Sequence, residues 1–245
     1  SKEYSLTVLA LKDKAGNNKF DPKSDKIAFF NEPITVPSTT MYELELFAEK
    51  AKFKVEKPTQ ESNNKLFIGY SGDAKNTKVT AKNNGKEVPI KLTKFTEKSK
   101  DSLQVFFPLA ITDSLDISIE NGNYNKQFTT KLKDFKEADS LSIENKTGST
   151  LSFRNSFVLK TKTPLNSIDE SKIFIRKKDS TLVKFTSKYD EFNQEIAFDF
   201  TKEEDQKYSI EILPGAIKDF YETSNDSLKF DFSTRLLSDY GNLKV

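Results

Sequence analysis

The sequence predicts an all-β fold made of tandem antiparallel β-sandwiches. Apolar residues recur at every second position in most segments, and no stretch of a dozen residues repeats them at the helical period of 3.6. Short turn sequences such as Asn83-Asn84-Gly85 and Asn121-Gly122-Asn123 separate the alternating runs. The chain has 245 residues, which is enough for two or three sandwiches of about 100 residues each.

The predicted strands are short and follow one another along the whole chain, which favours sandwiches over a parallel α/β sheet. One helical turn is expected near residues 216–221. The strands are expected at residues 4–11, 41–47, 65–70, 77–82, 103–107, 115–120, 124–131, 141–144, 157–162, 172–176, 195–200, 208–213 and 228–233.

Domain boundaries are expected near residues 48 and 136. The first predicted strand begins almost at residue 1, so residues 1–47 are interpreted as the C-terminal half of a sandwich whose other strands lie upstream. Residues 48–136 alternate as strands do, and we expect there a β-sandwich of unassigned type. Residues 137–237 are expected to form the next sandwich, and the polar run at 238–245 is typical of a linker to a further domain.

The absent residue types exclude several kinds of chemistry. The chain contains no His, no Cys and no Trp. Ser-His-Asp triads, ordinary zinc sites, iron–sulfur clusters and haem ligation all need His or Cys. Basic and acidic residues nearly cancel, 39 against 37, which gives no basis for binding nucleic acid or an anionic membrane surface. Paired carboxylates stay possible, but no pair stands out, and we expect no enzyme activity.

A loop near the N-terminus has the residue types of a calcium site. Oxygen ligands at alternate loop positions suit a hard cation such as Ca²⁺. Position 3 of this loop is Ala15, which offers no side-chain oxygen. The alternative is an Asx-rich hairpin loop that needs no metal. The candidate ligands are Asp13, Asn17, Lys19 through its carbonyl, Asp21 and Asp25.

A short phrase, Asp-Ser-Leu, recurs four times, each time immediately before an alternating run, and Asp179-Ser180-Thr181 is a related phrase. It resembles the acceptor sequence for general O-glycosylation of exported proteins in Bacteroidota. The alternative is turn chemistry, since Asp-Ser favours a turn and an aliphatic residue begins the next strand. The candidate acceptors are Ser102, Ser114, Ser140, Ser180 and Ser227.

Two stretches carry family resemblances. Residues 208–219 read Tyr-Ser-Ile-Glu-Ile-Leu-Pro-Gly-Ala-Ile-Lys-Asp, residues 230–234 read Phe-Asp-Phe-Ser-Thr, and residues 157–161 read Phe-Val-Leu-Lys-Thr. With these, residues 150–234 resemble the bacterial Ig-like domain first described in S-layer proteins. Residues 4–13, Tyr-Ser-Leu-Thr-Val-Leu-Ala-Leu-Lys-Asp, and the calcium-type loop after them make residues 3–47 resemble the C-terminal half of a carboxypeptidase-regulatory-like or Cna-B-type sandwich.

This order of domains resembles the Ig-like-domain surface lipoproteins of Bacteroidota. The resemblance implies tandem Ig-like sandwiches on the extracellular face of a Gram-negative outer membrane, held by a lipid anchor outside this chain. We expect a non-catalytic cell-surface scaffold that binds other outer-membrane or surface proteins, as an accessory subunit of an outer-membrane assembly. The alternative is a glycan-binding module of a surface polysaccharide-capture system, with an aromatic platform drawn from Phe106, Phe107, Tyr189, Phe192, Phe220 and Tyr221.

Overall fold

A computed structural model of the chain describes residues 3–21, 24–49, 51–97 and 100–239. The regular elements in these ranges are antiparallel strands, apart from two single-turn 3-10 helices at Glu170–Lys172 and Leu237–Asp239. The all-β prediction is therefore confirmed. None of the described helices is long and apolar enough to cross a membrane.

The chain divides into two compact units, formed by Ser1–Lys54 with Ser71–Asn76, and by Val55–Tyr70 with Thr77–Val245. The predicted boundaries near residues 48 and 136 stay predictions. Of the predicted linker at 238–245, residues 240–245 lie outside the described residues, and residues 238–239 belong to the last 3-10 turn.

The first unit contains two antiparallel strand pairs, β1 with β4 and β2 with β3. The prediction of one strand over residues 4–11 is wrong in detail, because the chain changes pairing partner after Leu6. The strand predicted at 41–47 is also wrong. Only Phe47 pairs there, in an isolated bridge with Ile27 of β3. The bounds are Tyr4–Leu6 for β1, Leu9–Lys12 for β2, Lys26–Phe29 for β3 and Ile34–Val36 for β4.

Apolar side chains of this unit are largely in contact with solvent. Tyr4 is 59% exposed and Leu9 60%, whereas Ala28 is buried. A two-stranded sheet has no second layer to cover its apolar face. The proposal that residues 1–47 are half of a sandwich stays a prediction.

A first sandwich follows, with two sheets in the strand orders β10-β11-β7-β5, where β6 also pairs with β7, and β13-β12-β8-β9. Leu66, Leu103, Val105, Ile117 and Ile119 are fully buried. The bounds are Lys54–Val55 for β5, Thr59–Ser62 for β6, Lys65–Ser71 for β7, Lys78–Asn83 for β8, Lys86–Val88 for β9, Lys91–Glu97 for β10, Lys100–Phe106 for β11, Ser114–Asn121 for β12 and Tyr124–Lys131 for β13.

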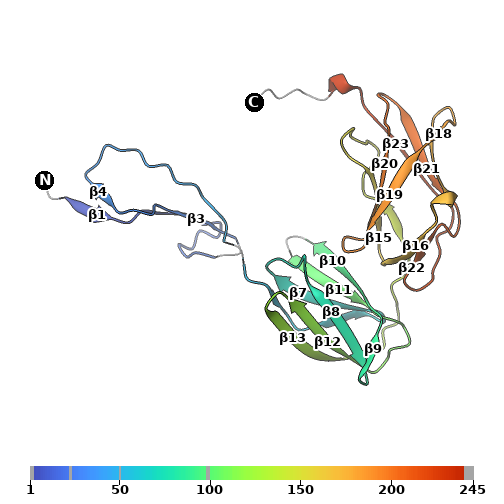
Figure 1. Cartoon of the computed structure of the whole chain (residues 1–245), viewed down its shortest axis with the longest axis horizontal. Coiled ribbons are helices and arrows are strands. Elements are labelled where there is room, and N and C mark those ends of the chain that lie inside the picture. The colour runs from blue at the N-terminus through green and yellow to red at the C-terminus, as the bar shows by residue number, and fades with distance from the viewer. Residues whose placement is uncertain (1–2, 22–23, 50, 98–99, 240–245) are drawn as a thin grey trace. The chain divides into compact units, whose positions relative to one another are not determined.

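The second sandwich has the sheets β14-β15-β20-β19 and β18-β17-β21-β23, with a small pair β16-β22 at one end (Figure 1). The bounds are Ile143–Asn145 for β14, Phe157–Thr161 for β15, Leu165–Ile168 for β16, Ile173–Lys177 for β17, Leu182–Val183 for β18, Phe185–Asp190 for β19, Glu195–Phe200 for β20, Lys207–Ile212 for β21, Ile217–Asp219 for β22 and Leu228–Ser233 for β23.

The helical turn predicted near residues 216–221 is wrong. Residues Ile217–Asp219 form β22, because β16 in the connection between β15 and β17 offers them a ladder. Gly215 precedes this strand with a φ of +71°, a backbone conformation that glycine adopts without steric cost.

Both sandwiches have the strand order of an immunoglobulin domain, whose strands A, B, E and D form one sheet and whose C, F and G form the other. Taking β14 as A and β15 as B, the second sandwich reads A-B-E-D and C′-C-F-G. The first sandwich gives the same two orders when β7 is B. In the second, Tyr208 on strand F accepts a hydrogen bond from Glu203 N at 2.8 Å, the position of the tyrosine corner of such domains. The sandwich of unassigned type thus has Ig-like topology.

Candidate functional site: a polar junction between the two sandwiches

The segment that joins the two sandwiches, residues 132–142, lies against the turn between β6 and β7. Three side-chain amides, one from β6 and two from that turn, pair with its backbone. Gln60 Nε2 donates to Lys133 O at 3.0 Å, and Lys133 N donates to Gln60 Oε1 at 2.7 Å. Asn64 makes the same reciprocal pair with Asp139, at 3.1 Å for each bond.

Asn63 repeats the arrangement with Phe135, whose carbonyl accepts from Asn63 Nδ2 and whose N–H donates to Asn63 Oδ1. A side-chain amide carries a donor and an acceptor side by side. It can therefore bond both the N–H and the C=O of one residue, as a neighbouring strand would. The joining segment therefore has its backbone groups satisfied at three points without forming a strand of its own.

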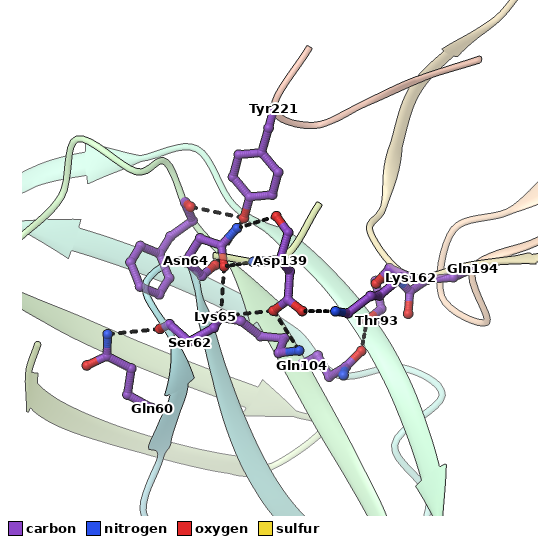
Figure 2. A network of polar contacts seen from close by, with 11 residues as sticks. Gln60, Ser62, Asn64, Lys65, Thr93, Gln104, Asp139, Lys162, Gln194 and Tyr221 are labelled. Carbon is purple, nitrogen blue, oxygen red and sulfur yellow. Dashed lines mark hydrogen bonds and ion pairs between the residues drawn. The ribbon is translucent and has the colours of Figure 1, made fainter. Parts of the chain in front are cut away.

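A buried carboxylate sits at the centre of this junction. Asp139 is 9% exposed, and its Oδ2 lies 2.7 Å from Lys65 Nζ and 2.9 Å from Ser62 Oγ. Its Oδ1 lies 3.1 Å from Lys162 Nζ, which comes from the second sandwich. Figure 2 shows Asp139 between Lys65 and Lys162. One carboxylate thus bridges ammonium groups of both sandwiches.

The protonation of Asp139 follows from its partners. Burial alone would raise its pKa, but the hydrogen bonds from Lys65 and Ser62 outweigh burial, and the pKa of Asp139 lies below its ordinary value. The side chain is therefore ionised at neutral pH.

A tyrosine from the second sandwich completes the junction. Tyr221 Oη lies 3.0 Å from Asn64 O (Figure 2). It also lies 3.2 Å from Phe107 O. Asp219, fully buried, holds the loop by accepting from Tyr221 N at 2.9 Å and from Thr163 Oγ1 at 2.9 Å. Burial raises the pKa of Tyr221, and the nearby carboxylates of Asp139 and Asp219 raise it further, so the hydroxyl stays a donor.

A second contact lies on β10. Lys91 Nζ is 2.6 Å from Glu191 Oε2, and Lys94 N donates to Phe192 O at 2.6 Å. Glu191 and Phe192 belong to the turn between β19 and β20. The two sandwiches therefore touch at two separate places, one centred on Asp139 and one on this turn.

Sequence reasoning treated Asp139 as half of a glycosylation signal and Tyr221 as part of an aromatic platform, so it missed their shared place in the junction. The one available signal was the run Gln60–Asn64, which carries three amides where a loop usually carries Gly or Pro.

Three side chains of the predicted calcium site, Asp13, Asn17 and Asp25, accept hydrogen bonds from the loop's own backbone. Asp13 accepts from Gly16 N at 2.8 Å and Asn18 N at 2.6 Å. Asn17 Oδ1 accepts from Lys19 N at 2.8 Å.

Asp25, buried, accepts from Asp21 N at 2.9 Å and Lys14 N at 3.0 Å. These two backbone bonds lower its pKa. Within the described ranges, no group of three or more acidic side chains is placed to hold a metal ion. Calcium binding by Asp13, Asn17, Lys19, Asp21 and Asp25 stays a prediction.

The predicted O-glycosylation sites differ in exposure. Ser140, Ser180 and Ser227 are exposed, whereas Ser102 and Ser114 are half-buried within strands β11 and β12. An acceptor hydroxyl must reach a transferase, so the exposed three fit the prediction better. Their modification stays a prediction.

The six candidate platform aromatics do not gather on an exposed face. Phe106 and Phe107 are fully buried, and Tyr189, Phe192, Phe220 and Tyr221 are each half-buried. Tyr189 accepts from Leu165 N at 2.9 Å. Phe106 and Phe107 belong to the core, and Tyr221 belongs to the junction.

The fold and the junction together define a tandem Ig-like module whose two sandwiches share a polar interface. No family model matches the chain, and no curated protein matches it.

Among solved structures the chain is similar to a fragment of two tandem titin Ig domains, at 8% identity over 75% of this chain and 96% of that chain, with a TM-score of 0.25. It is also similar to domains 5–6 of the S-layer protein SbsC, at 10% identity over 76% of this chain and 100% of that chain, with a TM-score of 0.28. A third is SGBP-B of a Bacteroides ovatus mixed-linkage glucan utilization locus, in complex with a heptasaccharide, at 9% identity over 95% of this chain and 60% of that chain, with a TM-score of 0.25. The Ig-like assignment rests on the strand order and not on these scores.

Proposed function

We propose that this chain is a non-catalytic scaffold and interaction module, in which two Ig-like sandwiches act as one rigid spacer. The observation that carries the proposal is the junction around Asp139. Three amides hold the joining segment, and one carboxylate bridges lysines of both sandwiches. A flexible linker between independent domains makes few contacts, whereas this segment is bonded to the first sandwich at three points.

A cell-surface position is the second part of the proposal. It is supported by the sequence resemblance to Ig-like surface lipoproteins of Bacteroidota, which also implies an accessory role in an outer-membrane protein assembly. A charged edge strand such as β13 is a place where a partner can add a strand through backbone hydrogen bonds.

A catalytic function has little support. A hydrolase with two carboxylates needs one of them protonated near neutral pH, so its pKa has to be raised. The described carboxyls whose pKa clearly departs from its ordinary value are all shifted downward: Asp25, Asp139, Asp169, Asp179, Asp190 and Glu203.

The scaffold role is tested by purifying the full-length tagged protein from detergent-solubilised native envelopes and identifying what accompanies it. We expect a stoichiometric outer-membrane protein, retained after washing at moderate salt. Recovery of this protein alone would contradict the assembly role.

A further inference from the structure

A charged hollow lies on the outer face of the β18-β17-β21-β23 sheet, in the second sandwich alone. Its volume is about 440 Å³, within the range of sites for small ligands. The lining includes Arg176, Lys178, Lys207, Ser209 and Asp231. Nothing in the spacer role above uses this surface.

The strand register explains the hollow. Arg176 on β17 lies opposite Ser209 on β21, and Ser209 lies opposite Asp231 on β23. Opposed residues of neighbouring strands share a face of the sheet. A small serine therefore stands in the middle of the row, between an arginine and an aspartate with longer side chains. The floor of the hollow is this serine.

The cations at one end of the hollow lack acidic partners. Glu211 is shared between Arg176 at 3.4 Å and Lys229 at 3.5 Å. Within the part of the chain that the structure describes, no carboxylate lies within ion-pair distance of Lys178 or Lys207.

Lys178 and Lys207 are also neighbours across the two strands. Lys178 N donates to Lys207 O at 3.0 Å, one step beyond the last registered pair of β17 and β21, Lys177 with Tyr208. Like charges directly opposite one another destabilise a sheet. An anion held between the two ammonium groups would remove that repulsion.

We propose that this hollow binds the carboxylate of an acidic sugar, a uronic acid unit of a glycan. Lys178 and Lys207 take the carboxylate. The carboxylate of Asp231 accepts hydrogen bonds from ring hydroxyls, and the Ser209 hydroxyl donates or accepts. A dense polyanion suits the hollow less well, because Asp231 and Glu211 repel it.

The ligand class follows from this mixture of groups. A uronic acid carries one carboxylate next to several hydroxyls. The hollow offers two ammonium groups for the carboxylate, and a carboxylate and a hydroxyl for the sugar hydroxyls. Its affinity for the sugar would come from charge-assisted hydrogen bonds and not from stacking on aromatic rings. Ser180, a predicted glycosylation site, also lines the hollow. The test therefore uses protein whose mass shows Ser180 to be unmodified.

The experiment titrates the whole chain by calorimetry with three probes of matched length: trigalacturonic acid, its methyl ester and triglutamate. The ester keeps the rings and hydroxyls but has no carboxylate charge, and the peptide has carboxylates but no sugar hydroxyls. The double variant Lys178→Gln/Lys207→Gln is compared with Lys184→Gln/Lys188→Gln, which removes two exposed lysines of the same sandwich outside the hollow.

We expect trigalacturonic acid to bind, and the ester and the peptide to bind at least about tenfold more weakly. The double variant in the hollow should lose about tenfold or more in affinity, and the control pair less than about twofold. The hollow variant should also unfold at no lower temperature than the native chain, since it removes a like-charge pair.

Three outcomes would overturn the proposal. One is a dissociation constant for trigalacturonic acid weaker than about 10 mM. Another is an equal loss in both double variants, which indicates diffuse charge attraction. The third is equal binding of triglutamate, which assigns the hollow to carboxylates without a sugar. None of these outcomes bears on the spacer role, which is measured at the junction.

Discussion

At the scale of single residues, Asp139 is the side chain on which the junction depends most. Asp139→Asn removes the negative charge and leaves Lys65, whose side chain is 11% exposed, without its acidic partner. Loss of one member of a buried pair costs about 3–5 kcal/mol. The Lys162 side chain is 59% exposed, so water solvates its ammonium group when the carboxylate is gone. We therefore expect the free energy of unfolding, measured in urea, to fall by an amount near the lower end of that range. Asp134→Asn, at an exposed position of the same segment, should change stability by less than about 0.5 kcal/mol.

The same residue predicts how stability changes with pH. The pKa of Asp139 is lowered in the folded chain, so the folded state favours the ionised form. The contribution of ionised Asp139 to folding stability is complete above its unfolded pKa of about 3.9. That contribution is lost as the pH falls through the lower pKa of the folded state. The stability difference between the native chain and Asp139→Asn should therefore be constant from about pH 7 to pH 5 and shrink below about pH 4. A difference that grows on acidification would contradict this assignment.

Tyr221 offers a separate test of the junction. Its hydroxyl lies within hydrogen-bond distance of Asn64 O and Phe107 O. Tyr221→Phe keeps the ring and removes the hydroxyl donor, which should cost about 1 kcal/mol for the lost hydrogen bond. Asn64 O keeps its bond from Phe107 N. Tyr42→Phe, in the first unit, is the matched control, and its effect on the unfolding of the sandwiches should be negligible. A loss of equal size in both variants would place the effect outside the junction.

At the scale of elements, the joining segment is a structural element without secondary structure. Its amides at Lys133, Phe135 and Asp139 donate to side-chain oxygens of Gln60, Asn63 and Asn64. We expect these three N–H groups to exchange slowly with deuterium, although neighbouring residues of the segment are exposed. Asn64→Ala should release protection at Asp139 first, while Gln60→Ala should release it at Lys133 alone. Uniformly fast exchange across the segment in the native chain would show that the side chains of Gln60, Asn63 and Asn64 do not hold its backbone.

The sequence predicted most strands of the two sandwiches because alternation records which side chains face a core. The runs at 115–120 and 228–233 lie within β12 and β23. The same pattern was misleading at 41–47, since alternation does not show whether a run pairs along its length with a neighbouring strand. It also missed β22, whose ladder depends on β16, about 50 residues earlier in the chain.

The junction was beyond sequence reasoning for a related reason. Asn64 and Asp139 are separated by 75 positions, and nothing local distinguishes a buried Asp-Ser from an exposed turn. Only the fold brings Lys65 and Lys162 to the same carboxylate. In the calcium-type loop the candidate residues were visible in the sequence. Their hydrogen bonds to the loop's own N–H groups could not be predicted from it.

At the scale of the whole molecule, the spacer role requires the two sandwiches to tumble as one body. Contacts at Asp139 and at the Lys91–Glu191 pair are separate points of attachment, and two separated points resist bending better than one. We expect residual dipolar couplings from residues 55–131 and 143–233 to fit a single alignment tensor.

The double variant Asp139→Asn/Lys91→Gln should weaken both attachments, because it removes the bridging carboxylate from one and the side-chain ion pair from the other, while leaving each Ig-like core intact. Its couplings should then need two tensors, and small-angle scattering should show a broader distribution of sizes. Asp134→Asn/Lys86→Gln, which changes the same residue types at exposed positions, should keep the single tensor. If the native chain already needs two tensors, the sandwiches move independently and the module is a flexible tether, in which case partner binding has to be explained by each sandwich alone.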